Sequence, residues 1–123
     1  ASGGRAKEDN WYQAREENAT PSAIEDKDRA QRMVNNDLEN IPHGMIVAWA
    51  SIFVISKVGD DDQKDTYAIT QIVAYSFFVA ARYTHSIVYS CGLSIPRSIA
   101  YLVGITCVFA ISINAVIASY AIV

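Results

Sequence analysis

Residues 77–89 read FFVAARYTHSIVY, an apolar run that is interrupted by Arg82 and His85. Only one other charged side chain, Arg97, follows Asp65 in the last 58 residues of the chain. A charged group at membrane depth is costly unless it faces the interior of the protein or meets a partner. Both arginines therefore need an anion from an earlier part of the chain, from another subunit or from a ligand.

The composition indicates a single membrane domain with a polar head. Residues 1–40 hold six Lys/Arg and nine Asp/Glu, whereas residues 41–123 hold four of each. The net charge of -3 and the lack of a basic patch argue against a nucleic-acid partner. With only His43 and His85 present, no zinc-type ligand cluster is expected. Cys91 and Cys107 are predicted to be inert buried thiols and not a disulfide.

The chain divides into a polar extramembrane connector, residues 1–26, and a helical transmembrane domain, residues 27–123. In the connector, Trp11 and Tyr12 have two open interpretations, an interfacial anchor or a locally packed loop contact. The chain opens with ASGGR and shows no signal peptide. We expect it to be a processed or truncated product, or part of a longer protein.

The fold class is predicted to be an all-α transmembrane bundle with three visible spans. The first runs from about residue 27 to 58, is capped by Ser22 or Asp26, and is kinked or loosened at Pro42. An acidic loop, residues 59–65, leads to the second span, from about residue 66 to 91. The third runs from about Arg97 to the end and contains small residues that let helices approach closely.

Polar residues in the first span, and the larger polar and aromatic residues in the second, recur every three or four positions. This spacing places each set on one helix face. In the first span these are Arg29, Arg32, Asn36, Glu39 and His43; in the second they are Gln71, Tyr75, Phe78, Arg82, His85 and Tyr89.

Short loops make the three spans alternate across the membrane. The start of the first, the end of the second and the start of the third therefore share one side, where the polar residues converge. Residues 1–32 hold six Lys/Arg, against Lys57 and Lys64 near the opposite loop. The positive-inside tendency places the polar cluster on the cytoplasmic side or its topological equivalent.

Two interpretations of this cluster stay open. Arg82 pairs with Glu39 or Asp37, and Arg32 with the other, as ties between helices that need no ligand. Alternatively, the arginines form a one-sided intramembrane pocket for an anionic, partly apolar ligand. Because several polar groups converge at one depth, the combined pattern favours the ligand pocket.

The same residues resemble the signatures of the MAPEG family, the membrane-associated proteins in eicosanoid and glutathione metabolism. Residues 36–41, NDLENI, follow Arg29 and Arg32, and resemble the first signature. Arg82-x-x-His85-x-x-x-Tyr89, followed by residues 96–98, PRS, resembles the second. The resemblance runs from about Arg29 to the C-terminus, and is strongest to microsomal glutathione transferase-like and prostaglandin E synthase-like members.

This resemblance implies helices equivalent to helices 2–4 of a four-helix bundle that assembles as a homotrimer. Glutathione, the co-substrate, is then expected between neighbouring subunits near the cytosolic side. The residues expected to bind it are Arg29, Arg32, Asn36, Glu39, Arg82, His85 and Tyr89. Arg97 and Ser98 are the expected catalytic residues near the sulfur. The implied activity is a glutathione-dependent transferase or peroxidase that acts on lipophilic electrophiles or lipid hydroperoxides.

The sequence departs from the family pattern in two places. Residues 33–35, MVN, replace a segment that commonly holds a basic residue or His. The transmembrane helix that the family places before the connector is also expected to be lost or absent from this chain. These departures motivate an alternative, a non-catalytic structural subunit of a larger organellar membrane complex. The expected location is the endoplasmic reticulum or an organellar (mitochondrial or plastid) membrane, with membrane lipids as neighbours.

Overall fold

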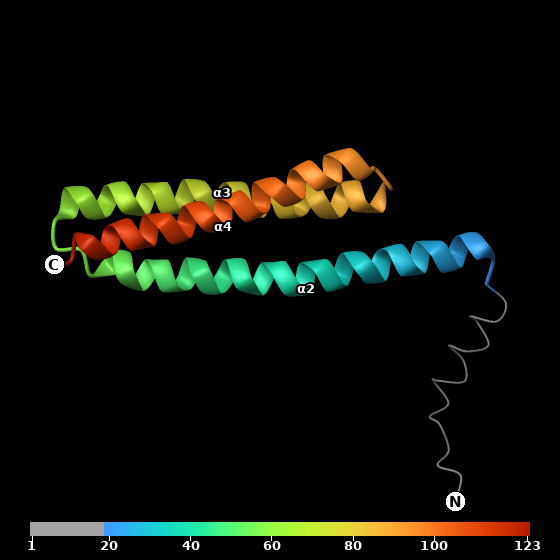
Figure 1. Cartoon of the computed structure of the whole chain (residues 1–123), viewed down its shortest axis with the longest axis horizontal. Coiled ribbons are helices and arrows are strands. Elements are labelled where there is room, and N and C mark those ends of the chain that lie inside the picture. Colours follow the sequence, from blue (N-terminus) through green and yellow to red (C-terminus); the bar gives the residue numbers. More distant parts are fainter. Residues whose placement is uncertain (1–18) are drawn as a thin grey trace, which may run out of the picture.

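The computed structural model describes residues 19–123, and this part of the chain forms three long helices (Figure 1). They are α2 (Pro21–Ser56), α3 (Asp61–Ser90) and α4 (Ser94–Tyr120). α3 runs opposite to α2 and α4, and each helix packs against the other two. The first turns of α2 extend beyond the turn that joins α3 to α4 (Figure 1). The predicted all-α bundle is confirmed. The expected roles of Trp11 and Tyr12 lie outside the described residues.

The start of α2 differs from the prediction. The helix begins at Pro21, so the last residues of the expected connector are helical. The hydroxyl oxygen of Thr20 accepts a hydrogen bond from the amide of Ala23 at 3.4 Å. Proline at the first helical position has its backbone angle preset for a helix. Thr20 is therefore the N-cap, and the predicted caps at Ser22 and Asp26 are wrong.

The acidic segment that joins α2 to α3 is also more helical than predicted. Asp60 caps α3, and its carboxylate accepts from the amides of Asp62 and Gln63 at 3.0 and 3.2 Å. Asp61 and Asp62 then lie in the first turn, where the helix dipole favours negative charge. The predicted loop of residues 59–65 is therefore wrong beyond Asp60.

The connection between α3 and α4 is a tight turn. Gly92 adopts a φ of 73°, a left-handed conformation that glycine accepts without a Cβ clash. Cys91 lies in this turn and is exposed, so its predicted burial is wrong. Cys107, within α4, is partly buried, and both thiols are free.

α2 and α4 are long and apolar enough, by length and composition, to cross a membrane. α3 is long enough, with 30 residues, but its composition is less apolar than this requires. Three polar side chains of α3, those of Gln71, Arg82 and His85, are buried and face the bundle. Exposed side chains of α3 include Ile72 and Phe77. Since short turns join α3 to both neighbours, we infer that it crosses back between them with its polar face inward.

Pro42 lies inside α2, and the helix continues through it. Proline removes one backbone donor from the helical ladder. Nearby side chains reach back to carbonyl oxygens of the preceding turn. The Asn40 amide donates to the carbonyl of Asn36 at 2.8 Å, and the ring Nδ1 of His43 contacts the carbonyl of Glu39.

α2 packs tightly on α3 at Gly44, which is buried against the ring of Phe78. A Cβ added at Gly44 would lie 2.3 Å from Cζ of Phe78, well inside van der Waals contact. The absence of a side chain at Gly44 therefore allows the Phe78 ring to lie against the backbone of α2.

We expect Gly44→Val to lower the free energy of unfolding by about 1–3 kcal/mol, because the added atoms overpack this contact. Thermal unfolding of the detergent-solubilised protein measures the change. Gly59→Val is the matched control, since a Cβ at Gly59 meets nothing within 4 Å. Equal melting temperatures for the two variants would contradict close packing at Gly44.

Candidate functional site

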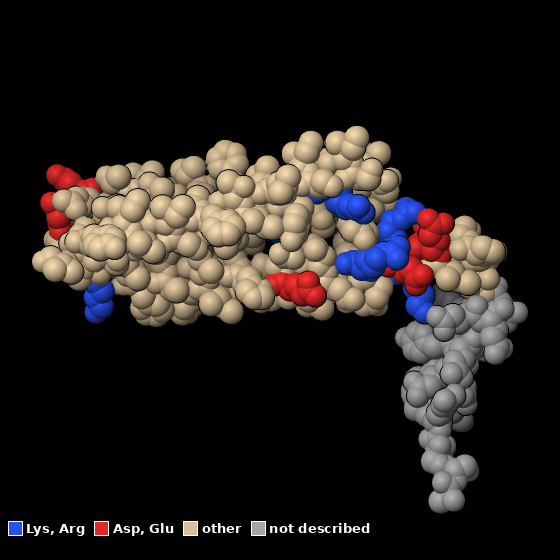
Figure 2. Space-filling view, in the orientation of Figure 1, with Lys and Arg blue, Asp and Glu red and all other residues tan. Residues whose placement is uncertain are grey.

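The predicted convergence of three helix ends is confirmed. Charged side chains gather towards the two ends of the bundle and are sparse over the middle of the face shown (Figure 2). At one end, the Ser90 hydroxyl lies 3.5 Å from the sulfur of Met33. A Cβ added at Gly92 would meet the Arg29 guanidinium at 3.1 Å. The start of α2 therefore lies beside the end of α3 and the turn into α4.

Arg82 obtains its anion from α2. Its Nη2 donates to Oδ1 of Asn36 at 2.8 Å and forms an ion pair with the carboxylate of Asp37. The Ser86 hydroxyl donates to the other oxygen of Asp37 at 2.8 Å. Only 5% of Arg82 is exposed, so this pair lies within the bundle. Of the two partners considered for Arg82, the structure selects Asp37 and not Glu39.

An open groove of about 390 Å³ lies at the same end of the bundle and is called the polar groove here. Its lining residues come from all three helices and are Asn36, His85, Tyr89, Arg97, Ser98, Tyr101 and Leu102. Five of these are sequence-predicted site residues. The structure therefore brings together both expected catalytic residues and three of the seven expected glutathione-binding residues.

A row of rings positions the cation of the polar groove. The guanidinium carbon of Arg97 lies 4.9 Å from the centroid of the Tyr89 ring, within cation–π range. The Tyr89 ring lies 5.7 Å from His85, and His85 lies 6.2 Å from Tyr101. Among residues 19–123, no carboxylate forms an ion pair with Arg97. The groove therefore presents a positive charge that no acidic side chain of the described part neutralises.

His85 is 3% exposed, and its Nδ1 has no hydrogen-bond partner within the described part of the chain. The Ser98 hydroxyl donates to the carbonyl of Ser94 at 3.2 Å, one turn earlier in α4. Ser98 is exposed and lies next to Arg97 at the start of α4. The polar groove thus combines a cation, a hydroxyl group, an amide and a buried imidazole.

The remaining predicted residues lie elsewhere in the protomer. Arg29 forms an ion pair with Glu25 at 3.2 Å and lines a neighbouring pocket, beside Met33 and Ser90, that shares Tyr89 with the polar groove. Arg32 and Glu39 are exposed and do not line the polar groove. A contribution of these two residues to a pocket shared between subunits stays a prediction.

Polar residues outside the predicted catalytic and glutathione-binding sets also contribute. Tyr101 lines the polar groove four positions after Arg97, and Ser86 reaches Asp37 from four positions after Arg82. Such spacings place each pair on one helix face. That signal was present in the sequence, but it is shared by many pairs that have no common function.

The model of the MAPEG family matches residues 2–117. This chain belongs to the MAPEG family. No curated protein and no solved structure matched the chain.

MAPEG membership, together with two helices of membrane-spanning length and composition, identifies the chain as an integral membrane protein. The expected departure from the family pattern, at residues 33–35, lies near the end of α3, at the same end of the bundle as the polar groove. The Met33 side chain is partly buried and accepts from Ser90, whereas Val34 and Asn35 are exposed. In this MAPEG chain, Met33 therefore supplies a packing contact between α2 and α3.

Proposed function

We propose that this MAPEG protein is a glutathione-dependent transferase or peroxidase, similar to microsomal glutathione transferase and prostaglandin E synthase. Its substrates are lipophilic electrophiles or lipid hydroperoxides. The supporting observation is Arg97, a cation with no acidic partner in the described part, which lies against Tyr89 in a groove that also contains Asn36 and Ser98. Glutathione is an anionic peptide, so a groove with an unpaired cation favours it electrostatically.

The chemistry needs a thiolate. A free thiol has a pKa near ~8.5 and is mostly protonated at neutral pH, and a neighbouring cation lowers that pKa. Arg97 would supply this charge. The Ser98 hydroxyl lines the same groove and would donate to the same sulfur once it turns away from the carbonyl of Ser94. The thiolate then forms a carbon–sulfur bond with an electrophile and displaces its leaving group.

The peroxidase reaction uses the same thiolate. The sulfur attacks one peroxide oxygen, the O–O bond breaks, and the departing alkoxide takes up a proton to give an alcohol. The glutathione sulfenic acid formed in this step reacts with a second glutathione to give the disulfide and water. Both reactions therefore require the same cation close to the sulfur.

Asn36 is the proposed contact for the glutathione backbone from α2. Its Oδ1 accepts from Arg82, which leaves its amide nitrogen as a donor towards a ligand. Arg82 and Asp37 thereby act as positioning residues that hold Asn36. His85 and Tyr89 complete the wall on α3.

A homotrimer would give roles to the exposed polar residues of α2. Arg32 and Glu39 lie on the outer surface of the protomer, where a neighbouring subunit would bring them next to bound glutathione. Arg29 lies nearer the start of α2, where it pairs with Glu25. The proposed location is the endoplasmic reticulum or an organellar membrane, with the polar groove on the cytoplasmic side.

Calorimetry on the full chain in nanodiscs tests the proposal, with glutathione and S-methylglutathione as ligands. We expect both to bind, and only glutathione to give the ultraviolet absorbance of a thiolate. Turnover is measured with an aryl electrophile and with a lipid hydroperoxide. Failure of both ligands to bind, together with co-purification of many other subunits, would contradict the proposal and support a structural subunit instead.

A further inference from the structure

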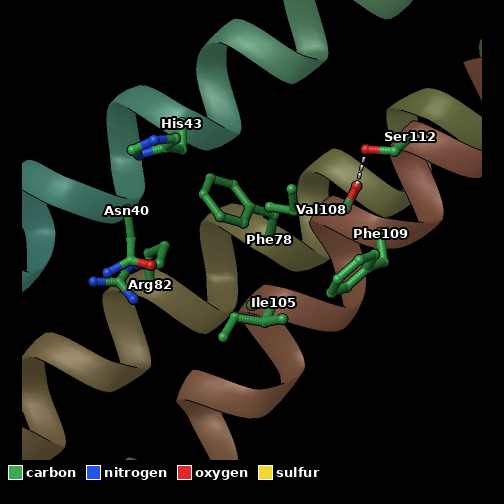
Figure 3. Close-up of a pocket in the computed structure, with 9 residues that line it drawn as sticks. Asn40, His43, Phe78, Arg82, Ile105, Val108, Phe109 and Ser112 are labelled. Carbon is green, nitrogen blue, oxygen red and sulfur yellow. Dashed lines mark hydrogen bonds between the residues drawn. The ribbon is translucent and has the colours of Figure 1, made fainter.

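A second pocket lies deeper in the bundle, and we infer that it binds a compact, ring-sized apolar group that carries a neutral hydrogen-bond acceptor. The pocket, called the deep pocket here, has a volume of about 150 Å³. Its walls include Asn40 and His43 of α2, Phe78 and Arg82 of α3, and Ile105 and Val108 of α4 (Figure 3). The assignment of this group to the electrophile rests on the proposed function.

The deep pocket follows the polar groove along the bundle. Asn40 lies one turn beyond Asn36 on α2, and Ile105 lies one turn beyond Tyr101 on α4. A helical turn rises 5.4 Å, so the deep pocket begins about 5 Å further into the membrane. The two sites are therefore consecutive along the side where α2 faces α4. A substrate with its apolar group in the deep pocket extends its reactive end towards the groove.

The size of the deep pocket limits its occupant. Phe78, Ile105, Val108 and Phe109 supply apolar walls (Figure 3), and the Phe78 ring is held against Gly44. An enclosed apolar cavity of about 150 Å³ accommodates a molecule the size of benzene. The deep pocket has a similar volume but is partly open, since His43 and Phe109 in its lining are exposed. The space fits one ring or a short branched group, whereas a complete acyl chain would extend out of it into the lipid.

The polar groups of the deep pocket define the rest of the ligand. Arg82 is 5% exposed, and its Nε is buried away from the pocket space, so this atom does not serve as a donor to the ligand. Asn40 uses its amide nitrogen to donate to the carbonyl of Asn36, and that nitrogen carries a second hydrogen. Because Asp37 already neutralises Arg82, a neutral acceptor such as a nitro or carbonyl oxygen is favoured over an anion.

Photolabelling of the full chain in nanodiscs with phenyl azide tests this inference without any need for turnover. Labelled peptides are mapped by mass spectrometry, with nitrobenzene as the competitor. We expect nitrobenzene to suppress labels on residues 105–112 of α4. We expect Val108→Phe, which fills the deep pocket, to reduce those labels about tenfold. Val116→Phe is the matched control, because Val116 is exposed on the same helix and does not line the pocket.

Labels that are spread over exposed residues of α4 and resist nitrobenzene would overturn the inference. So would equal labelling of the Val108→Phe and Val116→Phe proteins. The competition in the unaltered chain is decisive even if Val108→Phe fails to fold.

Kinetics separate this inference from the proposed function. If glutathione turnover exists, Val108→Phe should raise the KM for a nitroaryl electrophile several-fold and leave the KM for glutathione unchanged. Competed labelling without any glutathione turnover would refute the proposed function and retain the deep pocket. Turnover without competed labelling would retain the proposed function and refute the deep pocket.

Discussion

Asp37→Ala should lower the free energy of unfolding by about 3–5 kcal/mol, the range for removing one partner of a buried ion pair. The substitution leaves the Arg82 guanidinium inside the bundle without its anion and removes one of the two acceptors of the Ser86 hydroxyl. A single buried charge without compensation costs far more than the pair contributes. Denaturant unfolding of the purified chain in mixed micelles, without glutathione, measures the change.

Glu39→Ala is the matched control, because it removes the same charge from an exposed position two residues further along α2. We expect it to change the free energy of unfolding by no more than about 0.5 kcal/mol. The double variant Asp37→Ala/Arg82→Met should recover most of the lost stability, since no unpaired charge remains. Equal effects of Asp37→Ala and Glu39→Ala would show that Asp37 does not hold Arg82.

Arg97→Ala should lower kcat/KM for glutathione-dependent turnover by about 10²–10³-fold, the usual loss when one group that stabilises a developing negative charge is removed. Arg97 is the unpaired cation of the polar groove. Without it, the pKa of the glutathione thiol should return towards ~8.5. The rate of the variant should therefore keep rising with pH up to about that value, whereas the rate of the unaltered protein levels off at lower pH.

Two further variants test the role of charge at Arg97. Arg97→Lys keeps the charge and should retain part of the activity, because an ammonium group lacks the planar stacking of a guanidinium on Tyr89. Lys57→Ala removes the same charge from an exposed position at the opposite end of the bundle and should leave kcat/KM unchanged. If Arg97→Ala turns over glutathione as fast as Lys57→Ala, Arg97 has no part in activating the thiol.

The helical class, the common side of the three helix ends and the inward face of α3 were all predictable from the sequence. The predicted face of α3 lies in the bundle, with Gln71, Phe78, Arg82 and His85 buried. This succeeded because helical periodicity depends only on spacing along one chain segment. The MAPEG signatures likewise depend on local residue order, and the match of the family model supports that assignment.

The helix ends were harder to predict, because several polar residues in a row can each serve as a cap. Thr20, Ser22 and Asp26 are all suitable N-cap residues, and the structure uses Thr20 followed by Pro21. The acidic residues after Asp60 looked like a loop from their charge. Their position in the first turn of α3 is favourable because the helix dipole attracts negative charge there.

The ion-pair partner of Arg82 and the set of polar residues that share a groove depend on how the three helices pack together. Asp37 and Glu39 are two positions apart and therefore point to different sides of α2, so spacing alone gave no choice between them. The packing of α3 brings Arg82 to Asp37 and leaves Glu39 on the surface. The deep pocket likewise needs walls from all three helices, and its shape depends on contacts between side chains that are far apart in the chain.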